Sequence, residues 1–337
     1  ESNFRGLGQK INLNFMAGTG VLMSDDSVVT RPNLQAEISF YEPYFRNPYT
    51  SLAFRGFARN FGSYQVPLAI EERFGLDATV YRKFKAYKNL TGSLTFGFEN
   101  VKLSEGNWDK ISGMYNSADP KIPLALRDEQ LAGGLYAKLT PGLVYDTRDN
   151  VLNTRRGVLA SLSIEEAIKF SGDATSYGKL MGTLRKYIPA GRKSTVLLTA
   201  RAGGKLNGDI PEFAAYSLGG PYNVRGFNIA EVGTGTGYMS GSAEFRTPIP
   251  FIDRLTTNTF VNNIRIAAFL DAGKMFDQTL TDRLYNRPGY AISAGAGLRI
   301  FVPGLGPINL DYGFPLTNTA GSRNTGFFTF GMGDMLY

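Results

Sequence analysis

The feature that most constrains this sequence is a two-residue alternation of apolar and polar positions that recurs along the chain. From Ile308 to Phe314, every even position is apolar and every odd position is polar or glycine. Successive side chains of a strand point to opposite faces, so this period predicts β-strands. The pattern predicts fourteen clear strands, near residues 8–18, 34–42, 50–60, 73–84, 89–104, 130–146, 156–168, 174–188, 193–205, 238–247, 262–273, 289–301, 306–314 and 325–336.

Two weaker candidate strands, residues 212–218 and 226–232, flank Arg225 in a glycine-rich stretch. Counting both of them brings the total to sixteen strands. In the other interpretation, both segments are loop. The alternation alone leaves both interpretations open.

Charged residues lie inside the predicted strands, on the phase opposite the apolar one, as at Glu37, Arg55, Glu244 and Arg299. A soluble sandwich buries its apolar phase, whereas a transmembrane barrel turns that phase towards lipid and keeps a polar interior. A propeller is disfavoured because no repeat of about 40 to 50 residues is visible. Several segments also reach the roughly 9 to 11 residues that a tilted strand needs to cross a bilayer.

We therefore expect an all-β fold, an antiparallel transmembrane β-barrel that forms one domain over residues 1–337. An even number of antiparallel strands closes such a barrel and leaves no edge exposed to lipid. A membrane-spanning helix is not expected, because the apolar runs, such as Ile266 to Leu270, are much shorter than the roughly 20 residues that such a helix needs.

Composition narrows the function further. The chain has no His and no Cys, so it lacks the commonest general base, the commonest imidazole ligand of metals and any thiolate. We expect no enzyme, no metal site and no cofactor. The formal net charge is +7, but Lys and Arg are scattered and form no dense basic block. This distribution argues against a nucleic-acid partner and is compatible with anionic lipid head groups.

Five motifs occur in a consistent order and spacing along this strand pattern. They are Gly142 to Asn150 (GLVYDTRDN), Val224-Arg225-Gly226-Phe227 after Gly219-Gly220, Ser242 to Pro248 (SAEFRTP), Phe269 to Gly273 (FLDAG), and Pro303 to Pro315, which contains GPINLDYGFP. Together they resemble the BamA and TamA superfamily, the outer-membrane insertases and their relatives in two-partner secretion and plastid import. The first 140 residues match this family mainly in strand pattern.

The resemblance implies the C-terminal barrel domain of such a protein, a barrel of the sixteen-stranded type with an inward-folded lumen loop. It places residues 238–247 in the twelfth strand and makes residues 206–237 the lumen loop. Counting backwards, residues 8–18 become the third strand, so we expect two strands upstream of Glu1 and favour the loop interpretation. Periplasmic domains are likewise expected upstream of this chain.

The lumen loop carries the first set of candidate functional residues. The strand phases turn Glu244 and Asp271 to the inner face, where a loop that folds back can bring Arg225 to both carboxylates. A guanidinium suits this role because its planar fork pairs with carboxylates and stays charged, and the resemblance implies the same pairing. We expect Val224, Arg225, Gly226, Phe227, Glu244 and Asp271 to form an anchor for the loop. The alternative is that Arg225 is a solvated turn residue.

Glycines near the chain ends form the second candidate set. Gly331 and Gly333 lie in the last predicted strand, and Gly6 and Gly8 lie near the start of the chain. Glycine weakens a strand, and in this family the first and last strands meet at a seam that is thought to open and pair with a client strand. The glycines fit a weak strand seam, and the second pair does so only if no strand precedes Glu1. The alternative is that they relieve crowding.

The expected function is that of an outer-membrane protein assembly factor that folds and inserts β-barrel proteins. The expected partners are unfolded outer-membrane client proteins, outer-membrane lipids and accessory periplasmic proteins. The alternatives are a polypeptide-translocating pore of the same superfamily, or a barrel that acts as a porin or an anchor. The bacterial outer membrane is the expected location, with the plastid outer envelope as the alternative.

Overall fold

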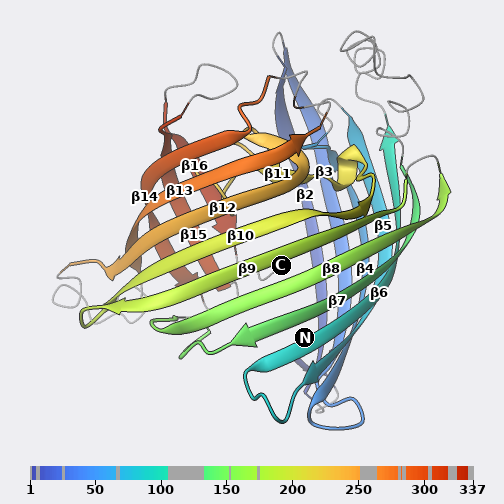
Figure 1. Cartoon of the computed structure of the whole chain (residues 1–337), viewed down its shortest axis with the longest axis horizontal. Coiled ribbons are helices and arrows are strands. Elements are labelled where there is room, and N and C mark those ends of the chain that lie inside the picture. Colours follow the sequence, from blue (N-terminus) through green and yellow to red (C-terminus); the bar gives the residue numbers. More distant parts are fainter. Residues whose placement is uncertain are drawn as a thin grey trace. The chain divides into compact units, whose positions relative to one another are not determined.

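A computed structural model of the chain describes residues 2–4, 8–24, 27–65, 69–104, 133–151, 153–172, 175–250, 264–279, 282, 286–302, 306–317 and 325–332, with side chains at most of them. These residues form β-strands joined by turns and loops (Figure 1). No helix among them is long and apolar enough to cross a membrane.

Fourteen strands of six residues or more make up the sheet. They are β2 (Gln9–Ser24), β3 (Ser27–Glu42), β4 (Thr50–Gly62), β5 (Ile70–Lys83), β6 (Leu90–Ser104), β7 (Gly134–Asp146), β8 (Gly157–Gly172), β9 (Tyr177–Ala190), β10 (Ser194–Gly208), β12 (Gly233–Pro248), β13 (Arg265–Gln278), β14 (Tyr290–Val302), β15 (Gly306–Pro315) and β16 (Phe327–Met332). The short elements are β1 (Ser2–Phe4), β11 (Tyr216–Leu218) and the 3₁₀ turn η1 (Glu212–Ala214).

The strands pair in chain order. The hydrogen-bonded order runs from β1 to β10, then from β12 to β16, and β11 pairs with β12 beside this path. The pairs whose register is resolved are antiparallel, as for β12 with β13 and β14 with β15. Within the described residues the path is open, from β1 at one end to β16 at the other. This is the all-β antiparallel sheet that the alternation predicts.

The chain divides into two compact units. Unit 1 consists of Glu1–Val144, Leu162–Leu180 and Gly204–Ala215, and it contains β1 to β6 and η1. Unit 2 consists of Tyr145–Ser161, Met181–Gly203 and Tyr216–Tyr337, and it contains β11 to β16. Strands β7, β8, β9 and β10 contribute residues to both units.

In both units the sheet exposes its apolar phase and buries its polar one. In β5 of unit 1, Phe74 is 59% exposed while Glu71 is 0% exposed. In β13 of unit 2, Leu270 is 52% exposed while the adjacent Asp271 is 0% exposed. A soluble protein would bury the apolar phase, so this arrangement suits a lipid solvent outside and a polar interior. The expected transmembrane pattern is confirmed; the two sides are called the exposed face and the buried face below.

Each unit also has a buried apolar cluster that includes residues of the segment between β10 and β12. In unit 1 the cluster comprises Val101, Tyr136, Ala167, Tyr177, Ile210, Phe213 and Ala214. In unit 2 it comprises Leu218, Val224, Phe227, Val232, Tyr238, Met275 and Ala291. Residues 209–232, called the β10–β12 loop below, are thus a packed part of the fold.

The structure agrees with the favoured loop interpretation and corrects the bounds of the loop. Residues 226–232 form no strand, and residues 212–218 form the turn η1 and the three-residue strand β11. The loop is shorter than residues 206–237, because β12 starts at Gly233. The glycines of this stretch are held by backbone pairing, Gly233 with Leu218 and Gly235 with Gln278. Strand β1 was not predicted either, and it pairs with β2.

Candidate functional site

The β10–β12 loop is tightly folded around Asn223. The backbone N–H groups of Gly219 and Val224 donate hydrogen bonds of 2.8 and 2.7 Å to Asn223 Oδ1. Gly219, Gly220 and Gly226 have positive φ angles of 112°, 105° and 86°, which residues with a Cβ rarely adopt. This local geometry fixes the direction in which the next residue, Arg225, leaves the loop.

Arg225 lies between two anchoring apolar residues. Val224 and Phe227 are both 0% exposed and belong to the buried cluster of unit 2. A Cβ on Gly273 of β13 would lie 2.9 Å from Val224 Cγ2, so the glycine makes room for the loop against the strand. Burial of these side chains holds the loop against the buried face of the sheet.

The Arg225 side chain reaches two carboxylates on neighbouring strands. Its Nε and Nη2 atoms donate hydrogen bonds of 2.7 Å each to the two oxygens of Asp271, a bidentate pairing. Its Nη1 atom donates to Glu244 Oε2. The backbone N–H of Arg225 also donates to Asp271 Oδ2, at 3.1 Å. The structure therefore brings together the three charged residues that the strand phases predicted.

Two further residues complete the surroundings of the guanidinium. Ser242 Oγ accepts a hydrogen bond of 3.0 Å from Arg225 Nη2 and donates one of 2.6 Å to Asp271 Oδ1. The guanidinium carbon lies 3.6 Å from the centroid of the Phe269 ring, in a cation–π contact. Arg225 is therefore fixed from several sides, and a solvated turn residue would not have such contacts.

The network extends to two strands that the sequence analysis did not connect with Arg225. Arg299 of β14 donates to both oxygens of Glu244, at 3.0 and 2.6 Å, and to Asp311 Oδ1 of β15, at 2.8 Å. Arg246 Nε donates to Glu244 Oε1. Three arginines thus face three carboxylates, which is the balance that buried charges require. Arg299 and Asp311 are on the polar phase of their strands, and that phase was the signal that could have found them.

Glycines allow the loop to approach β15 closely. A Cβ on Gly313 would lie 2.6 Å from the backbone nitrogen of Gly226, and a Cβ on Gly226 would lie 2.9 Å from the carbonyl carbon of Gly313. Both distances are shorter than real Cβ contacts, so neither position accepts a side chain without movement of the loop. The close contact of Gly226 with β15 thus explains why the third position of the VRGF motif is a glycine.

A separate set of contacts holds η1 in unit 1. Phe213 is buried against Tyr136, with the ring centroids 5.8 Å apart. Arg73 Nη2 donates a hydrogen bond of 2.8 Å to the carbonyl oxygen of Phe213, and Lys179 Nζ donates one of 3.1 Å to that of Ala214. The beginning of the loop is therefore fixed by cations that come from β5 and β9.

These cations belong to a second buried ionic network. Arg73 pairs with Glu71 and with Glu99, and Glu99 also accepts a hydrogen bond from Lys138. Sequence reasoning missed this network. The signal was again the polar phase of neighbouring strands, but the acceptors on the loop are backbone carbonyls, which carry no side-chain signature.

The GLVYDTRDN motif ends β7 and enters the turn before β8. Arg148 donates hydrogen bonds of 3.0 and 2.8 Å to the Asp146 carboxylate, and the backbone N–H of Arg155 donates one of 3.0 Å to Asp149 Oδ1. The hydrogen bond from Arg155 lowers the pKa of the Asp149 carboxyl below its ordinary value. These carboxylates hold a turn.

The candidate seam residues are only partly described. Gly331 lies in β16 opposite Asn309 of β15, and a Cβ on it would meet the ring of Tyr222 in the loop at 3.5 Å. Gly8 precedes β2 with a φ of 74°. Gly6 and Gly333 lie outside the described residues. The weakness of a seam at these glycines stays a prediction.

The contacts of this site are ion pairs and hydrogen bonds that hold a loop. Among the residues that the structure describes, no three His, Cys, Asp or Glu side chains are grouped so that they could hold a metal ion. Every carboxylate that contacts Arg225 is also hydrogen-bonded to Ser242 or paired with another arginine. The arrangement can position the loop and resist its displacement.

A meandering antiparallel sheet with an apolar exposed face, a charged buried face and a long loop packed on that buried face defines an outer-membrane β-barrel domain. The family model described as "Omp85 superfamily domain" matches residues 3–335. The chain belongs to the Omp85 superfamily, and the resemblance inferred from the motifs is confirmed. Members of this superfamily such as BamA reside in outer membranes, which places the chain in an outer membrane.

Curated relatives and solved structures agree with this assignment. "Protein TOC75, chloroplastic" of Pisum sativum is 23% identical over 79% of this chain and 32% of its own length. "Sorting and assembly machinery component 50 homolog" of Mus musculus is 27% identical over 68% of this chain and 50% of its own length. The crystal structure of BamA from Haemophilus ducreyi lacking POTRA domains 1-3 is 19% identical with a TM-score of 0.68, over 98% of this chain and 66% of that one. The chain thus spans about half or less of the length of these curated relatives.

Proposed function

We propose that this chain is the membrane domain of an outer-membrane protein assembly factor that folds and inserts β-barrel proteins. The observation that carries the proposal is the loop anchor: in an Omp85 domain, a charged loop is fastened by Arg225 to Glu244 and Asp271 on the buried face. The name of the mouse relative, a sorting and assembly machinery component, supports assembly of proteins over passive conduction.

In this proposal the anchored loop supports the strands at the end of the sheet. The loop contacts β15 through Gly226 and Gly313, and it contacts β16 through Tyr222 and Gly331. A fastened loop would keep these strands in register while the edge of β16 pairs with something else. The anchor residues Val224, Arg225, Gly226, Phe227, Glu244 and Asp271 would thus act by positioning.

The proposed seam uses the two ends of the strand order. Strand β1 pairs with β2 at one end of the strand order, and β16 pairs with β15 at the other. Glycine weakens strands, and an unpaired edge is a template for strand addition. The partners would be unfolded client barrels and the surrounding lipid, with accessory periplasmic proteins delivering the clients.

A second candidate is a polypeptide-translocating pore of the same superfamily. The match to the pea chloroplast relative over 79% of this chain supports it. The two functions differ in the fate of the client: an assembly factor leaves the client in the membrane, and a pore passes it across. Protease protection of a labelled client in sealed vesicles distinguishes the two outcomes.

The test of the proposed function is an insertion assay. The chain is reconstituted into liposomes, and the folding of an added unfolded barrel is followed by its resistance to SDS at low temperature. We expect the wild-type chain to accelerate insertion and Arg225→Glu to abolish the acceleration, because the new carboxylate faces Glu244 and Asp271. Arg192→Glu is the matched control, since Arg192 is exposed in the turn between β9 and β10. Unchanged folding and insertion by Arg225→Glu would show that the anchor has no role.

A further inference from the structure

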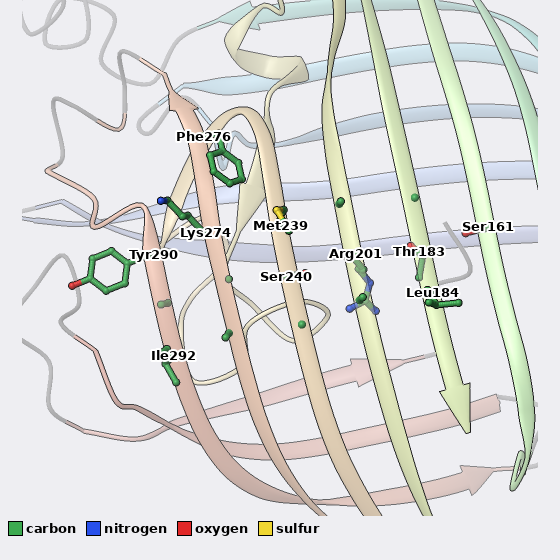
Figure 2. Close-up of a pocket in the computed structure, with 17 residues that line it drawn as sticks. Ser161, Thr183, Leu184, Arg201, Met239, Ser240, Lys274, Phe276, Tyr290 and Ile292 are labelled. Carbon is green, nitrogen blue, oxygen red and sulfur yellow. The ribbon is translucent and has the colours of Figure 1, made fainter. Parts of the chain in front are cut away.

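The exposed face of unit 2 has a hollow that takes no part in the loop anchor. It has a volume of ≈ 880 Å³ and lies over β8, β9, β10, β12, β13 and β14. Figure 2 shows Met239 and Ile292 beside it, with Lys274, Phe276 and Tyr290 on one side. Its volume falls in the range of roughly 300–1,000 Å³ that is usual for small-molecule sites.

The floor of the hollow is made of small residues in register. Ala200 of β10 lies opposite Gly241 of β12, which lies opposite Ala272 of β13. A Cβ on Gly241 would meet only the Thr199 carbonyl oxygen, at 3.8 Å, so no described side chain covers this point. Most of the exposed face carries large apolar side chains, and one of them, Met239, lies beside the floor. The surface is therefore hollow where the residues are small.

The lining of the hollow is apolar on the side that faces lipid. Besides the rim residues Lys274 and Tyr290, the lining includes four polar residues, namely Ser161, Thr183, Arg201 and Ser240. Each belongs to the phase of its strand that faces the opposite side, so its side chain points away from the hollow. An apolar chain is therefore the chemistry that fits the floor.

One cation stands at the rim. Lys274 is exposed and lies in register between Met239 of β12 and Tyr290 of β14. Its Nζ atom is 5.5 Å from the centroid of the Phe276 ring. Within the described part of the chain, no carboxylate lies within 4.0 Å of this ammonium. A lysine beside Tyr and Phe at the end of an apolar surface is typical of the level of the lipid head groups.

We propose that the hollow binds a glycerophospholipid with a net negative charge. An acyl chain lies over Gly241 and Ala272, and the head-group phosphate accepts hydrogen bonds from Lys274 Nζ and the Tyr290 hydroxyl. This ammonium, which has no carboxylate partner among the described residues, selects an anionic lipid over a zwitterionic one, because the zwitterionic lipid carries its own cation. The site uses no residue of the β10–β12 loop and is independent of the proposed assembly function.

Native mass spectrometry of the folded chain tests the proposal. The chain is released from detergent micelles after titration with phosphatidylglycerol or with phosphatidylcholine of the same acyl chains. We expect the wild-type chain to retain phosphatidylglycerol preferentially, and Lys274→Gln to weaken this binding about fivefold without changing phosphatidylcholine. Gly241→Leu should lower the retention of both lipids, because the leucine occupies the place of the acyl chain; Ala272→Leu serves the same purpose if Gly241→Leu does not fold.

Lys186→Gln is the matched control, since Lys186 is an exposed lysine of β9 outside the hollow. We expect it to bind both lipids as the wild-type chain does. An equal loss in Lys186→Gln and Lys274→Gln would overturn the proposal, because the effect would then be one of overall charge. Unchanged lipid retention in folded Gly241→Leu would overturn the proposal as well. It would also be overturned if Gly241→Leu abolished a dimer of the chain and left the lipid adduct unchanged.

Discussion

Replacing Arg225 by alanine should destabilise the fold mainly through Asp271. The substitution removes the bidentate pairing with Asp271, whose side chain is fully buried, and the contact with the Phe269 ring. Glu244 is less affected because it keeps both hydrogen bonds from Arg299. Breaking a buried ion pair costs about 3 to 5 kcal/mol.

The expected loss is about 3 kcal/mol, at the lower end of this range. Asp271 retains the hydrogen bond from Ser242 Oγ, and the backbone N–H of residue 225 survives the substitution. Such a loss lowers the folding equilibrium constant by about a hundredfold. Asp271→Ala should cost a similar amount, and the two substitutions together should cost less than their sum by about 2 kcal/mol.

The assay is guanidinium unfolding in lipid vesicles, followed by circular dichroism and extrapolated to water for the wild type, both single variants and the double variant. Arg192→Ala, at an exposed turn position, should stay within about 0.5 kcal/mol of the wild type. If Arg225→Ala is as stable as this control, or if the two substitutions are additive, Arg225 and Asp271 are not energetically coupled and the anchor reasoning fails.

Three further predictions follow from other contacts. Phe213→Ala should cost about 3 to 5 kcal/mol in the same unfolding assay and expose the loop to proteases, because the side chain is buried. Gly313→Ala should displace the loop and raise its proteolysis, because the new Cβ would lie 2.6 Å from the nitrogen of Gly226, whereas Gly204→Ala, with nothing within 4 Å, should not. A backbone hydrogen bond from Arg155 lowers the pKa of Asp149. The hydrogen-bonded carboxylate therefore stabilises the fold above the ordinary carboxyl pKa of about 3.9, and this stabilisation is lost as the pH falls through the lowered pKa. NMR should show the Arg155 amide signal moving below about pH 4 in the wild type and not in Asp149→Asn.

The apolar–polar alternation of the sequence predicted most of the strands and the face on which each residue lies. It could do so because the face of a strand is a local property of the sequence. It placed Glu244 and Asp271 on the buried face without knowledge of the neighbouring strands. It did not connect Arg299 and Asp311 with them, although both are on the polar phase. Their meeting depends on the register between strands, which the side-chain period does not specify.

Contacts made by the backbone were harder to predict from the sequence. The stretch from Gly233 to Gly237 has no side-chain pattern typical of a strand, yet it pairs with β11 and β13. The fastening of η1 by Arg73 and Lys179 uses carbonyl oxygens, which every residue type possesses. The seam glycines remain a prediction, since Gly6 and Gly333 lie outside the described residues.

The direction of the Arg225 contacts along the chain has a consequence for the order of folding. Glu244 lies 19 residues and Asp271 46 residues after Arg225, and Asp311 follows later still. Until β13 and β15 have formed, the loop carries a cation without its full set of partners. Contacts of such long separation form late. Docking of the loop therefore marks the completion of the C-terminal strands, and a chain truncated before β13 would leave this arginine without its bidentate partner.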